Sequence, residues 1–210
     1  MQAQQHFEPI TSDESQLIAE RDATEKALQA ARTSQQEAET HRDQLIAKQA
    51  EINRAITDVQ REQVTASKTA SKAVIAVIGD RRKFHAAIAD AAKERVARDQ
   101  AATVLLGALT YLTDEEIPQA EVRVTEAAIG VVKASLDWVT AAGRLDAFKT
   151  QTLLGHALAH DPGLSVNVSE NSHAAVFAQK INALELDLAA LNDKLRKQQD
   201  IARRKIGGNL

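Results

Sequence analysis

The sequence contains no cysteine, which excludes disulfide bonds, thiolate catalysis and zinc sites built on cysteine. Aromatic residues make up only 3% of the 210 residues, so the large side chains that fill most globular cores are scarce. Proline and glycine are also few, at three and eight residues. Because these two residues interrupt helices, their scarcity favours long helices that pack through Leu, Ile, Val and Ala.

The sequence also lacks a strong excess of charge and a long apolar run. A net charge of −3 gives no general attraction to nucleic acid or to anionic membranes. The longest stretch without charge, Gln100–Thr113, is shorter than the roughly 20 apolar residues that span a bilayer. Residues 1–16 contain no basic segment followed by an apolar one. We therefore expect no transmembrane segment, no signal peptide, and a protein that is cytoplasmic at synthesis and later virion-associated if it belongs to a phage particle.

What the sequence does contain is a heptad pattern near its C-terminal end, where apolar residues recur at alternating steps of four and three. This pattern is the seam of a coiled coil, and it needs a partner helix to bury it. Gln198 and Ala202 continue the same spacing. We predict that this seam is an interface with another helix, and its apolar members are Phe177, Ile181, Leu184, Leu188, Leu191 and Leu195.

A second, weaker seam runs through the N-terminal part of the chain at positions seven residues apart. Its members are Leu17, Thr24, Ala31, Ala38, Leu45, Ile52, Val59, Ala66 and Ala73. The complementary positions are mixed, with polar Arg21, Gln35, Arg42, Gln49 and Gln63 and apolar Leu28, Ile56, Ala70 and Val77. We therefore expect this helix to be partly exposed or to pack against more than one neighbour. The predicted interface residues are Leu17, Leu28, Leu45, Ile52, Ile56 and Val59.

The two seams indicate an all-α fold. We predict an elongated helical protein whose long N- and C-terminal coiled-coil helices flank a small central helical bundle. The predicted parts are a flexible arm at 1–10, a long coiled-coil helix at 11–78, a central helical domain at 79–160, a turn and extended segment at 161–171, a second coiled-coil helix at 172–206 and a tail at 207–210. Leu164, Val166 and Val168 alternate with polar residues, so this segment is a candidate docking strand.

Local signals divide these parts further. Gly79 either ends the first helix or bends it. Thr113–Glu116 has the composition of a helix start, and Gly143 is a candidate break in the helix that follows. The apolar run Val104–Leu109 is expected to be the centre of a small helical core. The repeat TASKTASK at 65–72 stacks small residues on one face, which predicts a thin helical segment or, alternatively, a hinge.

The charge distribution suggests a pairing of the chain ends. Residues 8–25 carry six acidic side chains and one basic one, and residues 194–205 carry six basic side chains and one acidic one. An antiparallel pairing of the terminal helices, within one chain or between chains, would bring these groups together. The alternative is that each group only complements the dipole of its own helix.

No arrangement of residues points to catalysis. His156 and His160 lie four apart on one helical face, a spacing that can hold zinc, with His173 as the nearest third ligand. The metalloprotease version needs Glu after the first histidine, and Ala157 occupies that position. Two histidines near a helix C-terminus are more simply explained by the helix dipole. The sequence has no glycine-rich phosphate loop and no serine-nucleophile motif, so we predict no enzyme activity, no metal and no cofactor.

These features favour a non-enzymatic structural or assembly protein that oligomerises or bridges partners through coiled-coil helices. In composition the chain is similar to many bacterial and phage assembly components, and we expect a component of a large particle such as a phage virion. Its partners would be further copies of itself, other structural proteins, or both. One alternative is a helical protein that binds nucleic acid through the basic clusters at 81–83 and 194–205. Another is a membrane-active helical protein.

Overall fold

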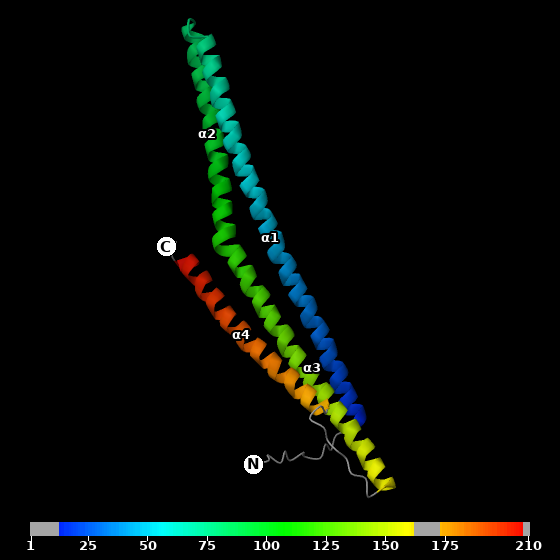
Figure 1. Ribbon diagram of the computed structural model, residues 1–210. Helices are drawn as coiled ribbons and strands as arrows, with labels where there is room; N and C mark the ends of the chain where they lie inside the picture. The colour runs from blue at the N-terminus through cyan, green and yellow to red at the C-terminus, as the bar shows by residue number, and fades with distance from the viewer. Residues whose placement is uncertain (1–12, 162–172, 208–210) are drawn as a thin grey trace. The chain divides into compact units, whose positions relative to one another are not determined.

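The computed structural model describes residues 13–161 and 173–207, with side chains up to Lys205. Its helices are α1 at Glu14–Ala76, α2 at Arg81–Tyr111, the π-helical turn η1 at Leu112–Glu116, α3 at Ile117–His160 and α4 at His173–Gly207 (Figure 1). The described residues contain no strand. The predicted all-α fold class, with long helices towards both ends of the chain, is confirmed. The arm at 1–10 and the candidate docking strand lie outside the described residues.

α1 runs for 63 residues because its sequence contains neither proline nor glycine. The helix begins beside Asp13, whose carboxylate accepts hydrogen bonds from the backbone N–H of Ser15 at 3.3 Å and from the Ser15 hydroxyl at 2.7 Å. The first of these bonds occupies a backbone N–H group that the first helical turn leaves without a partner. α1 passes unbroken through the TASKTASK repeat at 65–72, so the repeat does not interrupt the helix.

A tight turn reverses the chain between α1 and α2. The backbone N–H of Asp80 donates to the carbonyl oxygen of Val77 at 2.9 Å. The Asp80 carboxylate then caps α2, because it accepts from the backbone N–H groups of Arg82 at 3.1 Å and Lys83 at 3.2 Å. Gly79 therefore ends the first helix and does not bend it.

The helix start predicted at Thr113–Glu116 is wrong, because η1 joins α2 to α3 in one helical path. The reason lies in the spacing of the buried residues. Leu112 and Ala120 are buried in one cluster with Leu45, and Ile117 packs against that cluster. The step from Leu112 to Ile117 is five residues, where a regular seam has four. A π turn absorbs the extra residue and keeps both side chains on the same face.

The chain forms two compact units, and the first consists of Met1–Ala38 and Arg123–Lys197. Within it, α3 has α1 and α4 as neighbours (Figure 1). Gly143, a candidate break, lies inside the continuous helix α3. Between residues 123 and 148, α3 exposes only a narrow stripe of charged residues, and every other side chain there is buried or half-buried. The exposed stripe consists of Arg123, Glu126, Lys133, Asp137 and Arg144.

Most of the covered residues of α3 fall on two heptad stripes, and we assign one stripe to each neighbouring helix. The stripe beside α4 includes Gly143 and Asp146, which both contact α4 residues. The stripe beside α1 ends near Arg144 and Lys149, which both pair with α1 carboxylates. Trp138 belongs to this second stripe, and its indole Nε1 is buried with no hydrogen-bond partner among the described residues. The α4-side members are Thr125, Ile129, Val132, Leu136, Val139, Gly143 and Asp146, and the α1-side members are Val124, Ala127, Val131, Ala134, Trp138, Ala141, Leu145 and Phe148.

The second unit consists of Glu39–Val122 and Gln198–Leu210. In it, α1 and α2 form an antiparallel hairpin (Figure 1). A hydrogen bond from Gln63 Nε2 to Asp99 Oδ1, 2.9 Å long, fixes which turns of the two helices lie opposite each other. Apart from the cluster at η1, the hairpin has no buried core, and no residue of α2 is fully buried. Two helices alone cannot cover a whole side chain, so their seam stays half-exposed.

Candidate interaction surfaces

None of the positions of the predicted α4 seam is exposed. From Phe177 to Lys205, the residues that are not exposed recur at alternating steps of four and three, apart from Gln199, which is half-buried beside Gln198. The neighbour at the start of α4 is α3. A methyl group in place of the Gly143 hydrogen would lie 3.3 Å from Phe177 Cγ, and His173 Nδ1 lies 3.1 Å from Asp146 Oδ2. The α4 seam therefore has a partner helix within its own chain, and its use between chains stays a prediction.

The seam of α1 is also visible as a stripe of covered residues. Ala73 is the one member of either predicted stripe that is exposed, and Val74 is half-buried in its place. Among the predicted interface residues of α1, the three leucines Leu17, Leu28 and Leu45 are buried, and Ile52, Ile56 and Val59 are half-buried. As in α4, these side chains already pack within the chain.

The arginines of the α1 seam are neutralised by carboxylates on the same helix. Arg42 donates to Asp43 Oδ1 from Nε at 3.0 Å and from Nη2 at 2.7 Å. Arg21 makes the same two contacts with Asp22. The hydrogen bonds to these carboxylates raise the pKa of both guanidinium groups further above their usual range. Each arginine therefore carries its charge beside a carboxylate at a half-buried seam position.

The charged ends of the terminal helices pair with the helices between them. In the first unit, Glu14 lies 3.8 Å from Lys149 Nζ, and Glu20 lies 3.0 Å from Arg144 Nη1. In the second unit, Lys205 Nζ lies 3.6 Å from Asp114 Oδ1. Among the described residues, these contacts take the place of the antiparallel pairing that we considered for the two chain ends. Pairing between chains is a separate arrangement that stays a prediction.

Lys205 also donates a hydrogen bond to a backbone carbonyl group that the π turn leaves without an N–H donor. In η1 the backbone N–H of Ile117 donates to the carbonyl oxygen of Leu112, five residues back. The same pattern would give the Thr113 carbonyl to Pro118, which has no N–H. Lys205 Nζ donates to this oxygen at 3.2 Å. The end of α4 therefore stabilises the junction between α2 and α3.

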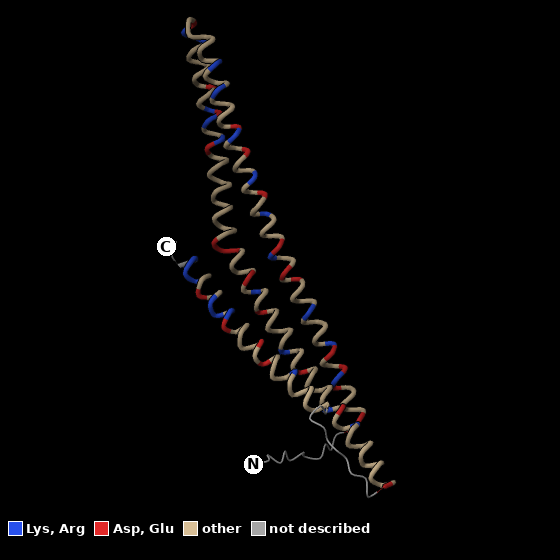
Figure 2. The backbone as a smooth tube through the Cα atoms, viewed as in Figure 1, with Lys and Arg blue, Asp and Glu red and all other residues tan. Residues whose placement is uncertain are grey.

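The hairpin of the second unit exposes many large apolar side chains. Contrary to expectation, the run Val104–Leu109 is not the centre of a core, because Val104 is 71% exposed and Leu106 is 51% exposed. The cause is that α1 covers only one face of α2 here. Figure 2 shows the uncharged stretch Gln100–Thr113, which runs from α2 into the start of η1, in tan, without blue or red. The exposed large apolar residues of the hairpin are Ile46, Val64, Ile75, Ile78, Ile88, Val96, Val104, Leu106 and Tyr111.

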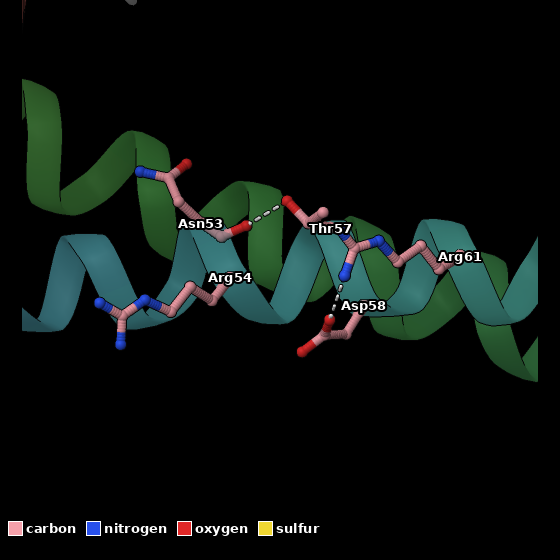
Figure 3. Close-up of a pocket in the computed structure, with 5 residues that line it drawn as sticks. All are labelled: Asn53, Arg54, Thr57, Asp58 and Arg61. Atoms are coloured by element: carbon pink, nitrogen blue, oxygen red, sulfur yellow. Dashed lines mark hydrogen bonds and ion pairs between the residues drawn. The ribbon is translucent and has the colours of Figure 1, made fainter.

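Two surface hollows of the hairpin are lined by polar and small side chains. One is a shallow surface feature made by α1 alone, in which Arg61 Nη1 lies 3.7 Å from Asp58 and the Thr57 hydroxyl donates to the carbonyl oxygen of Asn53 (Figure 3). The other lies between α1 and α2, where the seam consists of alanines. Its lining residues are Glu62, Thr65, Ala66, Thr69, Ala70, Ala73, Ala87, Asp90, Ala91, Glu94 and Arg98.

The histidines and the basic cluster Arg81–Lys83 have ordinary surface environments. His156 and His160 are exposed, and His173 is paired with Asp146. No group of three or more His, Asp or Glu residues that could hold a metal ion occurs in the part of the chain that the structure describes. At the hairpin tip, Arg81–Lys83 is exposed, and one of its members, Lys83, lies 3.3 Å from the capping carboxylate of Asp80.

Comparison of the chain with known proteins gives no match among protein-family models, curated proteins or solved structures. Within residues 13–161 and 173–207, none of the helices combines the length and the apolar character that a membrane span requires. The properties of the surfaces described above are therefore the basis for proposing a function.

Proposed function

We propose that the protein is a non-enzymatic structural component that assembles with further copies of itself, or bridges other structural proteins, through the outer faces of its helices. The observation that supports this proposal is the apolar surface of the hairpin. Ile75 and Ile78 near the tip are 67% and 72% exposed, and Val104 is equally open. Large apolar side chains that the fold itself leaves open to water can be covered by a partner molecule.

Because the helix seams are packed within the chain, the outer faces of the helices remain for contacts with other molecules. The seams of α1 and α4 are occupied by helices of the same chain, so the chain does not need a partner to cover them. The exposed apolar residues of the hairpin lie outside these seams. In a larger assembly they would be covered by neighbouring subunits, and the long hairpin would set the distance between the parts that it connects.

A large particle such as a phage virion is the setting we propose for this role. Its support is the composition of the chain, with Ala- and Gln-rich helices, few aromatic residues and no cysteine. Long helices with open flanks are suited to repeated contacts between identical subunits.

The experiment that tests the proposal is the solution mass, measured by light scattering after gel filtration at low and at high salt. We expect a defined oligomer that persists at high salt, because apolar contacts are not screened. A monomer at all concentrations would contradict self-assembly, and the role would then depend on a separate partner protein.

A nucleic-acid role is a second proposal, which the exposure of Arg81–Lys83 at the hairpin tip favours. Binding through these groups would be carried by phosphate contacts, so it should weaken steeply as salt rises. The aromatic neighbours for base stacking are limited to Phe84, which is half-buried and packs edge-on against His85 with ring centroids 5.9 Å apart. If binding to a labelled oligonucleotide does not weaken as the salt concentration rises, this second role is contradicted.

A further inference from the structure

The two long sides of the α1–α2 hairpin differ in charge. The hollow between the helices shows which flanks share one side, because Glu62 and Thr69 of α1 line it together with Asp90 and Glu94 of α2. The other flank of α1 therefore shares a side with the other flank of α2. That α1 flank is uncharged and exposed, and its members are Gln60, Val64, Ser67 and Ser71.

The α2 residues on this second side form a stripe with a self-complementary order. Ile88, Ala92, Arg95, Asp99 and Leu106 are all exposed, and they follow one another at steps of four, three, four and seven. Steps of this size keep residues on one face of a helix. The stripe therefore has an apolar residue at each end and two opposite charges at its centre.

This order is symmetric about the level of Ala97. Ile88 and Leu106 lie equally far from that level in opposite directions, and so do Arg95 and Asp99. If two copies of α2 pack antiparallel about a two-fold axis there, Ile88 of one copy meets Leu106 of the other. Arg95 of each copy then meets Asp99 of its partner. A two-fold interface requires this kind of reciprocal match.

We propose that this face of the hairpin is the contact between two copies of the chain, which pack antiparallel through α2. The proposal rests on the self-assembly proposed above and assigns it to one surface. Ile88 is 44% exposed and Leu106 is 51% exposed, so both side chains have apolar area to bury. The adjacent α1 flank adds no charge that association would have to desolvate.

Charge reversal tests the proposed contact. Arg95→Asp places two aspartates opposite each other at both symmetric positions, and Asp99→Arg does the same with two arginines. Each single variant should raise the dissociation constant about tenfold or more. The double variant Arg95→Asp with Asp99→Arg should restore affinity to within about threefold of wild type, because the pairs re-form with reversed signs. Asp99→Arg also removes the hydrogen bond from Gln63, so Gln63→Ala is the control for the loss of that bond within the hairpin. The measurement is sedimentation equilibrium on the full chain.

The chain offers a closely matched control on the outer face of α1 (Figure 3). Arg61 is 78% exposed and lies 3.7 Å from Asp58, as Arg95 is 78% exposed and lies 3.7 Å from Asp99. Arg61→Asp changes the net charge by the same amount away from the proposed contact, so it should leave the dissociation constant unchanged. Circular dichroism on all variants checks that the helices remain intact.

Cross-linking gives an independent readout, since the chain has no cysteine. A mixture of the Ile88→Cys and Leu106→Cys proteins should form a disulfide-linked dimer under mild oxidation, whereas either protein alone should not. A linked dimer from either single variant in equal yield would overturn the antiparallel register.

The outcomes separate this contact from the wider assembly role. If wild type forms an oligomer and the Arg95 and Asp99 variants associate as wild type does, the contact is wrong and self-assembly stands. The contact is also wrong if the double variant stays as weak as the single ones with its helices intact. A wild-type monomer at every concentration would overturn both the contact and self-assembly.

Discussion

Both units contain a long helix, but the two helices are buried to different extents. In the first unit α3 has two neighbouring helices, and only a narrow charged stripe remains exposed along most of its length. In the second unit α2 has one neighbour, and none of its residues is fully buried. Val139 in α3 is 5% exposed, whereas the similar side chain of Val104 in α2 is 71% exposed. The number of neighbours, and not the apolar content of a helix, decides how much of it is buried.

The largest effect on the difference in burial between the two units is expected when α3 loses one of its neighbouring helices. The double variant Leu184→Asp with Leu191→Asp places two charges in the α4 seam, at a cost of about 4 kcal/mol in unfolding free energy. We expect α4 to separate from α3 and the α1–α2 hairpin to remain helical. Chemical denaturation followed by circular dichroism measures both effects. Loss of less than about 1 kcal/mol would mean that the seam contributes little to packing within the chain.

The same charge placed in each unit tests the burial difference directly. Val139→Asp should lower the unfolding free energy by about 3 kcal/mol, because a buried carboxylate has no partner there. Ile88→Asp should change it by less than about 1 kcal/mol, because the side chain reaches water. Urea denaturation at low protein concentration, where the chain is monomeric, measures the two values. Equal effects would contradict the difference between the units.

A smaller effect is expected from the glycines. Gly107 in α2 faces open space, so Gly107→Ala should stabilise the chain by about 1 kcal/mol through helix propensity alone. Gly143→Ala should gain less or lose stability, because the new methyl group would lie 3.3 Å from Phe177 Cγ. Thermal denaturation compares the two variants. If Gly143→Ala stabilises as much as Gly107→Ala, the close approach of α4 to α3 at this point is wrong.

The smallest expected effect concerns a hydrogen bond at the π turn. The Tyr111 hydroxyl donates to Glu116 Oε1 at 2.5 Å, and this bond raises the pKa of the phenol above its usual range. The contribution to stability is therefore complete below pH 10 and is lost as the pH rises through the raised value. Absorbance titration of the single tyrosine measures the pKa of the phenol. Glu116→Gln should bring the pKa down towards the ordinary value, and an unchanged pKa would contradict the bond.

Heptad spacing predicted much of the fold, because the residues of a coiled-coil seam recur at regular intervals along the sequence. All the residues of α4 that the spacing named are half-buried or buried, and among the named positions of the N-terminal seam only Ala73 is exposed. Other features depend on contacts that no local pattern encodes. The π turn follows from Leu112 and Ile117 both packing near Leu45, which lies far away in the sequence. Gly143 resembles a helix break in sequence, yet it is a place where Phe177 approaches closely.

The proposed contact face of α2 could not be predicted from the sequence either. Ile88, Arg95, Asp99 and Leu106 do not form a recognisable seam in sequence, since the stronger stripe of α2 beside α1 overlaps them. Only after the hollow shows which flanks share a side does their order become meaningful. Exposure of Val104 likewise depends on how many helices surround α2, which the apolar content of the segment does not reveal.

Trp138 and Tyr111 provide the two units with separate spectroscopic signals. The chain has one tryptophan and one tyrosine, and Trp138 lies in the first unit whereas Tyr111 lies in the second. An indole Nε1 that is buried without a partner should fluoresce at short wavelength, and it should shift to the red when water reaches it. Loosening of the three-helix packing can therefore be followed by emission without any label, while the phenol reports separately on the hairpin.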